Sequence, residues 1–333
     1  YFTKCHNLDL MSLTLTTSDC YAIGMVLRVH SSMIENFHIN SCSIGDSGYQ
    51  QLSLGLAECD HLKVLDVAHN RLTDLHAAHL AHVIQRNSNY LQELHLRGNH
   101  FSSTGMAKLH HAIGNCVNLH VLWVGGEECV DVVTNITSFA HILQACTQLV
   151  QLYLFHFKLG DEGLTVLAPY LHKLQLSALG LTDVGLTATS APTVNAILAS
   201  QCQSLKVLYL DGNNLTDSFL LAVADTLCQC RHVTFVRLDN TGLTSSSLAT
   251  LATIGLSMGG VEILDVRDND FSQDDAAAAA DQLRVALVES RKQTNTSNSR
   301  CNLLMPGRQS VHGRIQAVLD AVSHEYLHVH YVH

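Results

Sequence analysis

Large apolar residues recur along the chain in a fixed pattern. The pattern reads L-x-x-L-x-L and is followed three residues later by asparagine or a small substitute. Clear copies begin at Leu62, Leu91, Leu205 and Val261. Weaker copies begin at Leu10, Ile34, Leu119, Leu149, Leu171 and Val233. From Ile34 onward the copies start about 28 residues apart on average, a period that indicates an internal structural repeat.

Each copy predicts a short strand followed by a helix. In the copy that begins at Leu62, the apolar residues Leu65 and Val67 alternate with their neighbours, as a strand with one buried face requires. Asn70 then ends the strand, where its side-chain amide can satisfy backbone groups of the turn. In residues 164–171 the apolar positions follow at i, i+3, i+4 and i+7, which is typical of an amphipathic helix.

A single strand–helix unit of this kind cannot bury its own apolar face, so neighbouring units must stack on it. Strands about 4.8 Å apart and helices about 8–10 Å apart cannot stack straight, so the strands should line an inner, concave face. We therefore expect a right-handed α/β horseshoe of about nine to ten repeats. Residues 34–288 would form the repeats, residues 1–33 an N-terminal cap or partial repeat, and residues 289–333 a polar loop and a C-terminal capping helix.

Short motifs between strand and helix identify the kind of repeat. Asn-Asn-Leu-Thr-Asp at 213–217, Ile-Gly-Asp-Ser-Gly at 44–48 and Leu-Gly-Asp-Glu-Gly at 159–163 resemble ribonuclease-inhibitor-type leucine-rich repeats. The run of residues 18–27, followed by Cys42 and Gly45-Asp46, resembles the sensor domain of NOD-like receptors. This resemblance implies a cytoplasmic domain of an innate immune receptor. Such a domain recognises a protein ligand and holds the neighbouring nucleotide-binding module inactive.

Other protein families share the same repeat. Ribonuclease inhibitor, Ran GTPase-activating proteins and tropomodulin-type proteins all carry it. The alternative function is therefore a stand-alone scaffold or inhibitor that clamps a folded protein partner in the concavity.

Composition and charge narrow the choice of function. The chain has 333 residues, 47% of them apolar and 14% charged, with a formal net charge of −10. The apolar fraction excludes a disordered chain, and the acidic balance makes nucleic-acid binding unlikely. No stretch is long and apolar enough to span a membrane. A phosphate-binding G-x-x-x-x-G-K-[ST] loop and a G-x-S-x-G motif are absent, so we expect neither an enzyme nor a cofactor.

The outward positions of the predicted strands form the candidate binding surface. Their middle row includes Thr14, His38, Asp66, His95, Trp123, Tyr153, Gln175, Tyr209, Arg237 and Asp265. The candidate binding residues are Trp123, Tyr153, Phe155, Tyr209, Asp211, Phe235, Arg237, Asp239, Asp265 and Arg267. Aromatic clusters on a rigid scaffold are typical binding hot spots, whereas the charged residues could equally form cross-strand pairs that stabilise the sheet. Stacking of RNA fragments on Trp123, Tyr153 and Phe155 is a lower alternative.

Two further features leave questions open. The repeats that begin at Leu119, Leu149 and Leu171 have irregular lengths of 30, 22 and 34 residues, which could mark a functional departure or simple drift. The string His324-Glu325-Tyr326-Leu327-His328 matches the zinc motif H-E-x-x-H, but we expect a solvated cap helix there, with His324 and His328 as weak metal ligands at most.

Five cysteines share one place in the repeat. Each lies three residues before a repeat start: Cys59, Cys116, Cys146, Cys202 and Cys230. Equivalent positions on adjacent helices should lie about 8–10 Å apart, beyond the roughly 7 Å Cα separation that a disulfide spans. We therefore expect small buried thiols in a reducing compartment.

Overall fold

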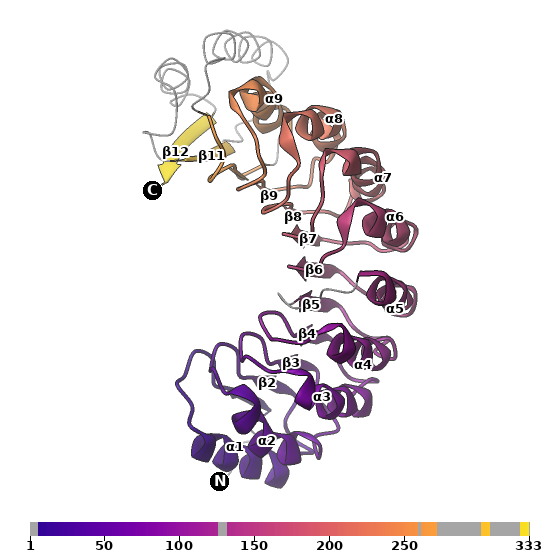
Figure 1. Cartoon of the computed structure of the whole chain (residues 1–333), viewed down its shortest axis with the longest axis vertical. Helices are drawn as coiled ribbons and strands as arrows, with labels where there is room; N and C mark the ends of the chain where they lie inside the picture. Colours follow the sequence, from indigo (N-terminus) through magenta and orange to yellow (C-terminus); the bar gives the residue numbers. More distant parts are fainter. Residues whose placement is uncertain (1–5, 126–131, 259–260, 272–300, 307–326, 333) are drawn as a thin grey trace. The chain divides into compact units, whose positions relative to one another are not determined.

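The computed structural model describes residues 6–125, 132–258, 261–271, 301–306 and 327–332. The chain divides into two compact units, one made of residues 1–159 with 169–174 and the other of residues 160–168 with 175–333. In each unit a layer of parallel strands is backed by a layer of helices (Figure 1). In the described part of the chain, no helix is both long and apolar enough to cross a membrane.

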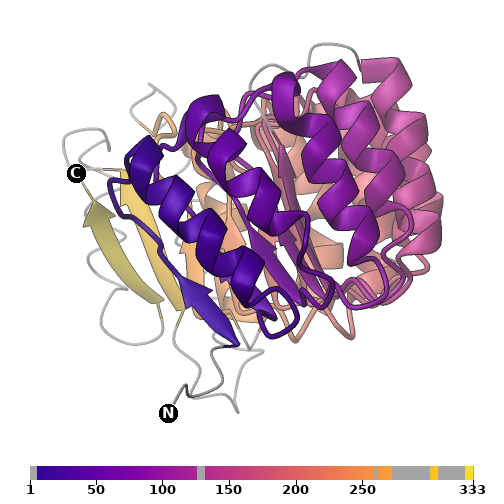
Figure 2. The same cartoon turned by 90° about the horizontal axis from the view of Figure 1, so that it is seen from below.

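The first unit contains strands β1 to β6, which pair in parallel in chain order. These strands are β1 (Asn7–Asp9), β2 (Asn36–His38), β3 (Val64–Asp66), β4 (Glu93–His95), β5 (Val121–Gly125) and β6 (Gln151–Phe155). The helices that follow the first five are α1 (Thr17–Val29), α2 (Gly45–Leu56), α3 (Asp74–Arg86), α4 (Ser103–Ile113) and α5 (Val132–Ala145). Figure 2 shows these helices side by side on one face of the sheet.

The second unit repeats the arrangement with β7 to β12, again paired in parallel in chain order. Its strands are β7 (Ala178–Thr182), β8 (Val207–Tyr209), β9 (Phe235–Arg237), β10 (Ile263–Asp265), β11 (Cys301–Pro306) and β12 (Leu327–Val332). Its helices are η1 (Ala188–Ser190), α7 (Ala191–Gln201), α8 (Thr216–Gln229), η2 (Ser245–Ser247) and α9 (Leu248–Ser257). Helix α6 (Gly160–Leu171) begins in this unit and ends among residues assigned to the first.

The pattern leucines form the core, which confirms a leucine-rich-repeat solenoid. The central pattern position is 0–1% exposed in eight strands from β3 to β10, at Leu65, Leu94, Leu122, Leu152, Leu179, Leu208, Val236 and Leu264. Each repeat thus buries the apolar side chains of its neighbours, and this burial stabilises the unit.

The structure corrects the phase of two repeats. Leu171 is the last residue of α6, and the seventh strand begins its pattern at Leu176. The starts at Leu149, Leu176 and Leu205 then lie 27 and 29 residues apart, so the expected lengths of 22 and 34 residues were wrong. Gly180 rather than Gln175 stands opposite Tyr209. In the first repeat, Asp9 rather than Thr14 pairs with His38.

Buried asparagines tie each turn to the next repeat. The Asn99 side chain is 2% exposed, and its Oδ1 accepts hydrogen bonds from the backbone N–H groups of Asn70 at 3.1 Å and Leu72 at 3.0 Å. Its Nδ2 donates to the carbonyl oxygens of Val67 and Leu96. Asn213 and Asn269 repeat this arrangement in the second unit. The repeated asparagine thus satisfies backbone groups of two adjacent turns, as its position in the pattern predicts.

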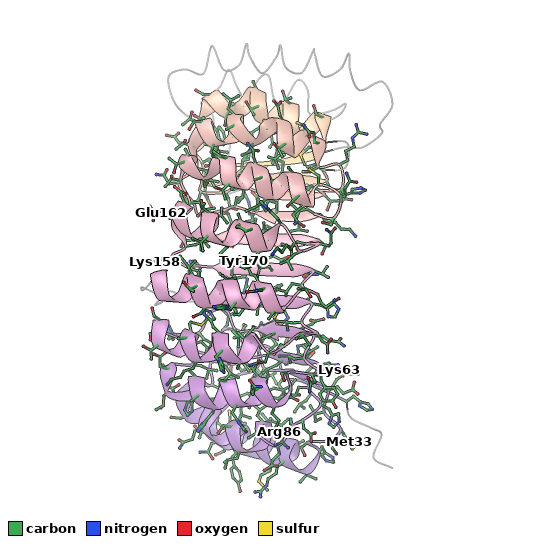
Figure 3. The ribbon with its side chains drawn as sticks, turned by 90° about the vertical axis from the view of Figure 1, so that its right-hand side faces the viewer. Met33, Lys63, Arg86, Lys158, Glu162 and Tyr170 are labelled. Carbon is green, nitrogen blue, oxygen red and sulfur yellow. The ribbon has the colours of Figure 1, made fainter. Side chains whose placement is uncertain are left out.

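Aspartates at the helix starts make a second link between repeats. Asp46 in the first turn of α2 accepts hydrogen bonds from the backbone N–H of Thr73 at 3.1 Å and from its hydroxyl at 2.7 Å. Thr73 itself caps α3. Asp74 holds Ser102, the cap of α4, in the same way. Exposed ion pairs such as Lys63 with Glu35, at 2.8 Å, add little beside these links (Lys63 is labelled in Figure 3).

Two expectations about the ends of helices and of the chain need correction. Cys202 and Cys230 are the C-caps of α7 and α8, and their Sγ atoms lie 2.6 Å apart. The expectation that helix spacing keeps equivalent cysteines too far apart for a bridge was therefore wrong for this pair. A helix through His328 was also wrong, because residues 327–332 form β12, which pairs in parallel with β11. His324 and the expected capping helix lie outside the described residues.

Candidate functional site

The strand face, meaning the side of each sheet that points away from the helices, brings three of the candidate residues together in the first unit. The register places His95 beside Trp123 and Trp123 beside Tyr153 on successive strands. Ring centroids lie 4.7 Å apart for His95 and Trp123 and 4.8 Å apart for Trp123 and Tyr153. Phe155 lies one row further along, stacked parallel to Tyr153 at 5.9 Å. We call these four residues the aromatic cluster.

A cation completes the aromatic cluster. Arg97, two residues beyond the end of β4, continues the row formed by Gly125 on β5 and Phe155 on β6, and Gly125 has no side chain to separate the other two. The guanidinium carbon of Arg97 lies 4.5 Å from the centroid of Phe155 and 5.2 Å from that of Trp123. Both distances fit cation–π contacts. Arg97 was not among the candidate residues, because the sequence pattern did not show that Gly125 lets its side chain reach the rings.

The rings of the cluster differ in their exposure. Trp123 and Phe155 are half-buried, whereas Tyr153 is only 7% exposed. Tyr153 is therefore a packing residue that supports the other two rings. The indole N–H of Trp123 is buried and has no hydrogen-bond partner among the described residues. An unpaired buried donor costs about 1–3 kcal/mol, so this position is not optimised for stability.

The charge of the cluster comes from Arg97. Burial lowers the pKa of His95, although the nearby carboxylates of Asp66 and Glu93 act in the opposite direction. The His95 ring is therefore neutral at neutral pH and acts as an aromatic neighbour of Trp123. Half-exposed aromatic rings beside a guanidinium provide a surface for planar, aromatic or peptide groups of a partner.

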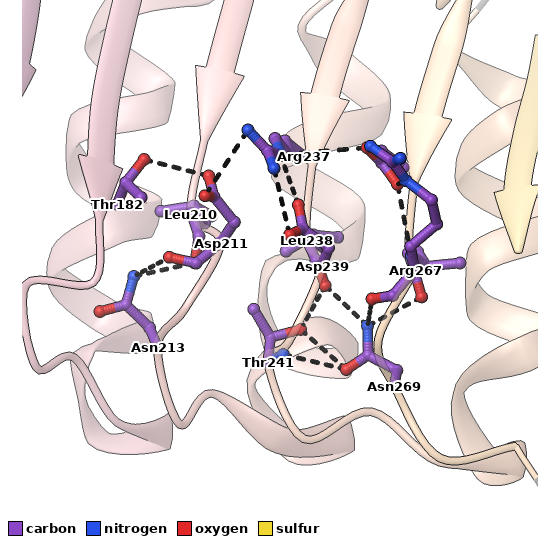
Figure 4. A network of polar contacts seen from close by, with 12 residues as sticks. Thr182, Leu210, Asp211, Asn213, Arg237, Leu238, Asp239, Thr241, Arg267 and Asn269 are labelled. Atoms are coloured by element: carbon purple, nitrogen blue, oxygen red, sulfur yellow. Dashed lines mark hydrogen bonds and ion pairs between the residues drawn. The ribbon is translucent and has the colours of Figure 1, made fainter. Parts of the chain in front are cut away.

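The remaining candidates lie in the second unit, and Figure 4 shows four of them, Asp211, Arg237, Asp239 and Arg267, in a network of polar contacts. The Tyr209 and Phe235 rings meet edge to face at 5.4 Å. Arg237 pairs with Asp239 through its Nε at 2.5 Å and approaches both Asp211 and Asp265 to 3.9 Å. Arg267 pairs with Asp265 at 2.6 Å. The register on β8, β9 and β10 brings these charges into one network.

The carboxylates of this network are buried. Asp265, Asp211 and Asp239 are 1%, 5% and 9% exposed. Burial raises the pKa of Asp211, while Arg237 acts to lower it. Since the two arginines already satisfy these carboxylates, the geometry favours cross-strand stabilisation of the sheet over an open acidic surface for a basic partner.

The weak metal candidates do not form a site in the described part of the chain. Within those residues, no group of three or more histidine, cysteine, aspartate or glutamate side chains is arranged to hold a metal ion. His328 lies in β12 and His324 lies outside the described residues.

The chain is similar to known leucine-rich-repeat proteins. A family model described as "Leucine Rich repeat" matches residues 58–75, 87–109 and 201–223. Pig (Sus scrofa) ribonuclease inhibitor is 29% identical over 273 residues, which cover 80% of this chain and 59% of that protein. Human "NACHT, LRR and PYD domains-containing protein 3" is 28% identical over 274 residues, which cover 79% of this chain and 25% of that protein.

Among solved structures, an internalin from Listeria monocytogenes aligns with 98% of this chain and 82% of its own, with a TM-score of 0.43 and 14% sequence identity. The fold assignment rests on the repeats themselves. The chain spans little more than half the length of the ribonuclease inhibitor and a quarter of the length of the human protein.

Proposed function

Taking as premise a chain of leucine-rich repeats related to ribonuclease inhibitor and to a NACHT- and PYD-containing protein, we propose that its aromatic cluster binds a protein ligand. The observation that carries this proposal is the position of Arg97 over both Trp123 and Phe155 on a sheet of paired strands. Tryptophan, tyrosine and arginine dominate binding hot spots, because each combines a large contact area with a polar or charged group.

Because the stacked repeats already fix the strands, this surface loses little conformational entropy when a partner binds. Each strand of the cluster is fixed by its neighbours through parallel pairing, and Tyr153 holds the rings from below. A partner therefore docks on a preformed surface and little ordering accompanies the association.

The proposed context is a cytoplasmic NOD-like receptor, in which this domain senses a ligand and restrains the nucleotide-binding module. The name of one relative includes a NACHT and a PYD domain, and the region of it that matches this chain is a quarter of its length. A repeat region that is one part of a larger protein with such domains supports this context. Except for Cys202 and Cys230, whose Sγ atoms lie 2.6 Å apart, the described cysteines are free thiols, which suits a reducing compartment. The domain acts by binding rather than by catalysis.

Variants of the aromatic cluster test the proposal. The wild-type chain, the double variant Trp123→Ala/Phe155→Ala and the control Leu75→Ala are immobilised, and the proteins that each retains from cytosol are quantified by mass spectrometry. Leu75 is 71% exposed on α3, so its removal changes apolar surface on the helix side only. We expect the control to retain the same proteins as the wild type and the double variant to lose them. Equal retention by all three chains would refute the proposal.

The ribonuclease-inhibitor relative favours one alternative, a stand-alone inhibitor of a folded enzyme. Titration of a pancreatic-type ribonuclease with the whole chain tests it directly. Stoichiometric inhibition would support the alternative, and the full reading frame would separate the two contexts by the presence or absence of a nucleotide-binding domain.

A further inference from the structure

An open, shallow pocket lies in the first unit, at the ends of β2, β3 and β4. The three loops that follow these strands border this surface depression, whose volume is about 430 Å³. Its lining consists of Ser41, Ser43, His69, Arg71, Gly98 and His100. The lining offers hydroxyl, imidazole and guanidinium groups and contains no carboxylate. Such a lining is unusual in a chain whose formal net charge is −10.

The asparagine links of the fold position two of the lining residues. The backbone N–H groups on either side of Arg71 both donate to Asn99 Oδ1, at 3.1 and 3.0 Å. Those on either side of Ser43 approach Asn70 Oδ1 in the same way, at 3.1 and 3.5 Å. Arg71 and Ser43 thus stand at corresponding points of successive turns, with left-handed φ angles of 57° and 51°. Buried hydrogen bonds thus fix the backbone on either side of Arg71 and Ser43, and this limits the positions that their side chains can take.

A glycine leaves room for the third group. Gly98 has a φ of 67°, and a Cβ there would lie 2.1 Å from His69 Nδ1. The imidazole of His69 therefore occupies space that any other residue would fill. Burial and the charge of Arg97 lower the pKa of His69, and Arg97 Nε donates to His69 Nε2 at 3.0 Å, so the neutral ring carries its own proton on Nδ1, the atom beside Gly98.

The carboxylate of Asp66, which acts electrostatically on His69, is held by other hydrogen bonds. Asp66 is 5% exposed and accepts hydrogen bonds from the backbone N–H of Ala68 at 3.0 Å and from Asn40 Nδ2 at 3.3 Å. Arg71 is exposed and makes no ion pair with any described residue. An anion in the pocket would therefore meet an unpaired guanidinium.

We propose that this pocket binds a phosphate monoester carried by a serine or threonine of the protein ligand. A phosphate group presents three terminal oxygens, which suits donors that come from three separate loops, namely Ser43, Arg71 and His100. A carboxylate has only two oxygens and one negative charge, so it would leave part of this donor set unused. Recognition of phosphorylated segments through arginine follows the same chemistry.

The pocket and the aromatic cluster belong to one continuous surface. Arg97 contacts His69 of the pocket through Nε and lies over Trp123 and Phe155 through its guanidinium face. A ligand segment can thus place its phosphate in the pocket while its neighbouring residues lie on the rings. This inference rests on the proposed function for the identity of the ligand, but the binding of phosphate itself does not.

Inorganic phosphate tests the pocket alone. The whole chain is titrated with sodium phosphate at constant ionic strength, and binding is followed by phosphorus NMR line broadening and by the fluorescence of Trp123, the single tryptophan. We expect saturable binding that Arg71→Ala weakens about tenfold or more, as the loss of a charged hydrogen-bonding partner implies. Arg28→Ala, which removes an exposed arginine from α1, should leave the affinity unchanged. No saturable binding, or equal weakening by both variants, would overturn the inference.

Peptides separate this inference from the proposed function. Binding of a degenerate phosphoserine peptide library and of its unphosphorylated counterpart is compared for wild type, Arg71→Ala and Trp123→Ala/Phe155→Ala. We expect the wild type to prefer the phosphorylated library and Arg71→Ala to lose that preference while keeping its ring-dependent binding. Ring-dependent binding without any phosphate preference would overturn the inference and leave the proposed function standing. Tighter binding of a single-stranded oligouridylate than of the phosphorylated library would also overturn it.

Discussion

Substitution of Asn99 by alanine tests how the repeats are held together. In the wild type this side chain makes four hydrogen bonds to backbone groups of two adjacent turns, at 2.9–3.1 Å, and is 2% exposed. Alanine would leave the N–H groups of Asn70 and Leu72 and the carbonyl oxygen of Leu96 without this partner, whereas the carbonyl oxygen of Val67 keeps its hydrogen bond from Asn70 Nδ2 at 3.1 Å. Each unpaired buried group costs about 1–3 kcal/mol, and water that enters the vacated space recovers part of the sum. We expect the first unit to lose at least about 3 kcal/mol of unfolding free energy.

Urea unfolding followed by Trp123 fluorescence measures this loss in the first unit, where the single tryptophan lies. Asn118→Ala is the matched control, because the exposed Asn118 side chain makes one hydrogen bond, to the carbonyl oxygen of Asn89 at 2.8 Å. The control should lose less than about 1 kcal/mol. Similar losses in the two variants would refute the idea that the buried asparagine links hold the turns.

Three further predictions concern stability. Burial lowers the pKa of His110, which is 2% exposed, to about 4, so the unfolded chain binds the proton more readily. The unfolding free energy of the first unit should therefore fall as pH drops below about 6.5, by about 2 kcal/mol between pH 7 and 5, and urea titrations of His110→Phe should lack this component. Leu208→Ala should cost about 2–5 kcal/mol in the second unit, as calorimetry can show, whereas Leu221→Ala, at a position 70% exposed, should be close to neutral. Gly98→Ala should destabilise the first unit measurably in urea, because the added Cβ meets the His69 ring and φ is 67°.

The repeat and its buried face could be predicted from sequence because the same apolar spacing recurs many times. The phase of a single copy was harder to assign. Leu171, Leu174 and Leu176 satisfy L-x-x-L-x-L, and so do Leu176, Leu179 and Leu181. The first and third pattern positions lie five residues apart, so an overlapping copy can begin where another ends. The same five-residue shift displaced the first repeat. Equal spacing between repeats would have selected the second alternative, since a stacked unit needs a nearly constant length.

The candidate site was predictable in its location but not in its details. Position in the repeat placed Trp123, Tyr153 and Phe155 on one face, and the register confirms it. Sequence could not show that Tyr153 is nearly buried or that Arg97 reaches Phe155, because both depend on the size of side chains on adjacent strands. The pocket at Arg71 was missed because its lining comes from three loops separated by whole repeats.

Quenching of Trp123 fluorescence by acrylamide, with and without a bound protein partner, tests the central claim most directly. The strand face is proposed as the binding surface, and the half-buried Trp123 is the single tryptophan on it. The account predicts that the free chain is quenched and that a bound partner protects the indole. Quenching that the partner leaves unchanged would contradict the account and place the binding surface elsewhere on the molecule.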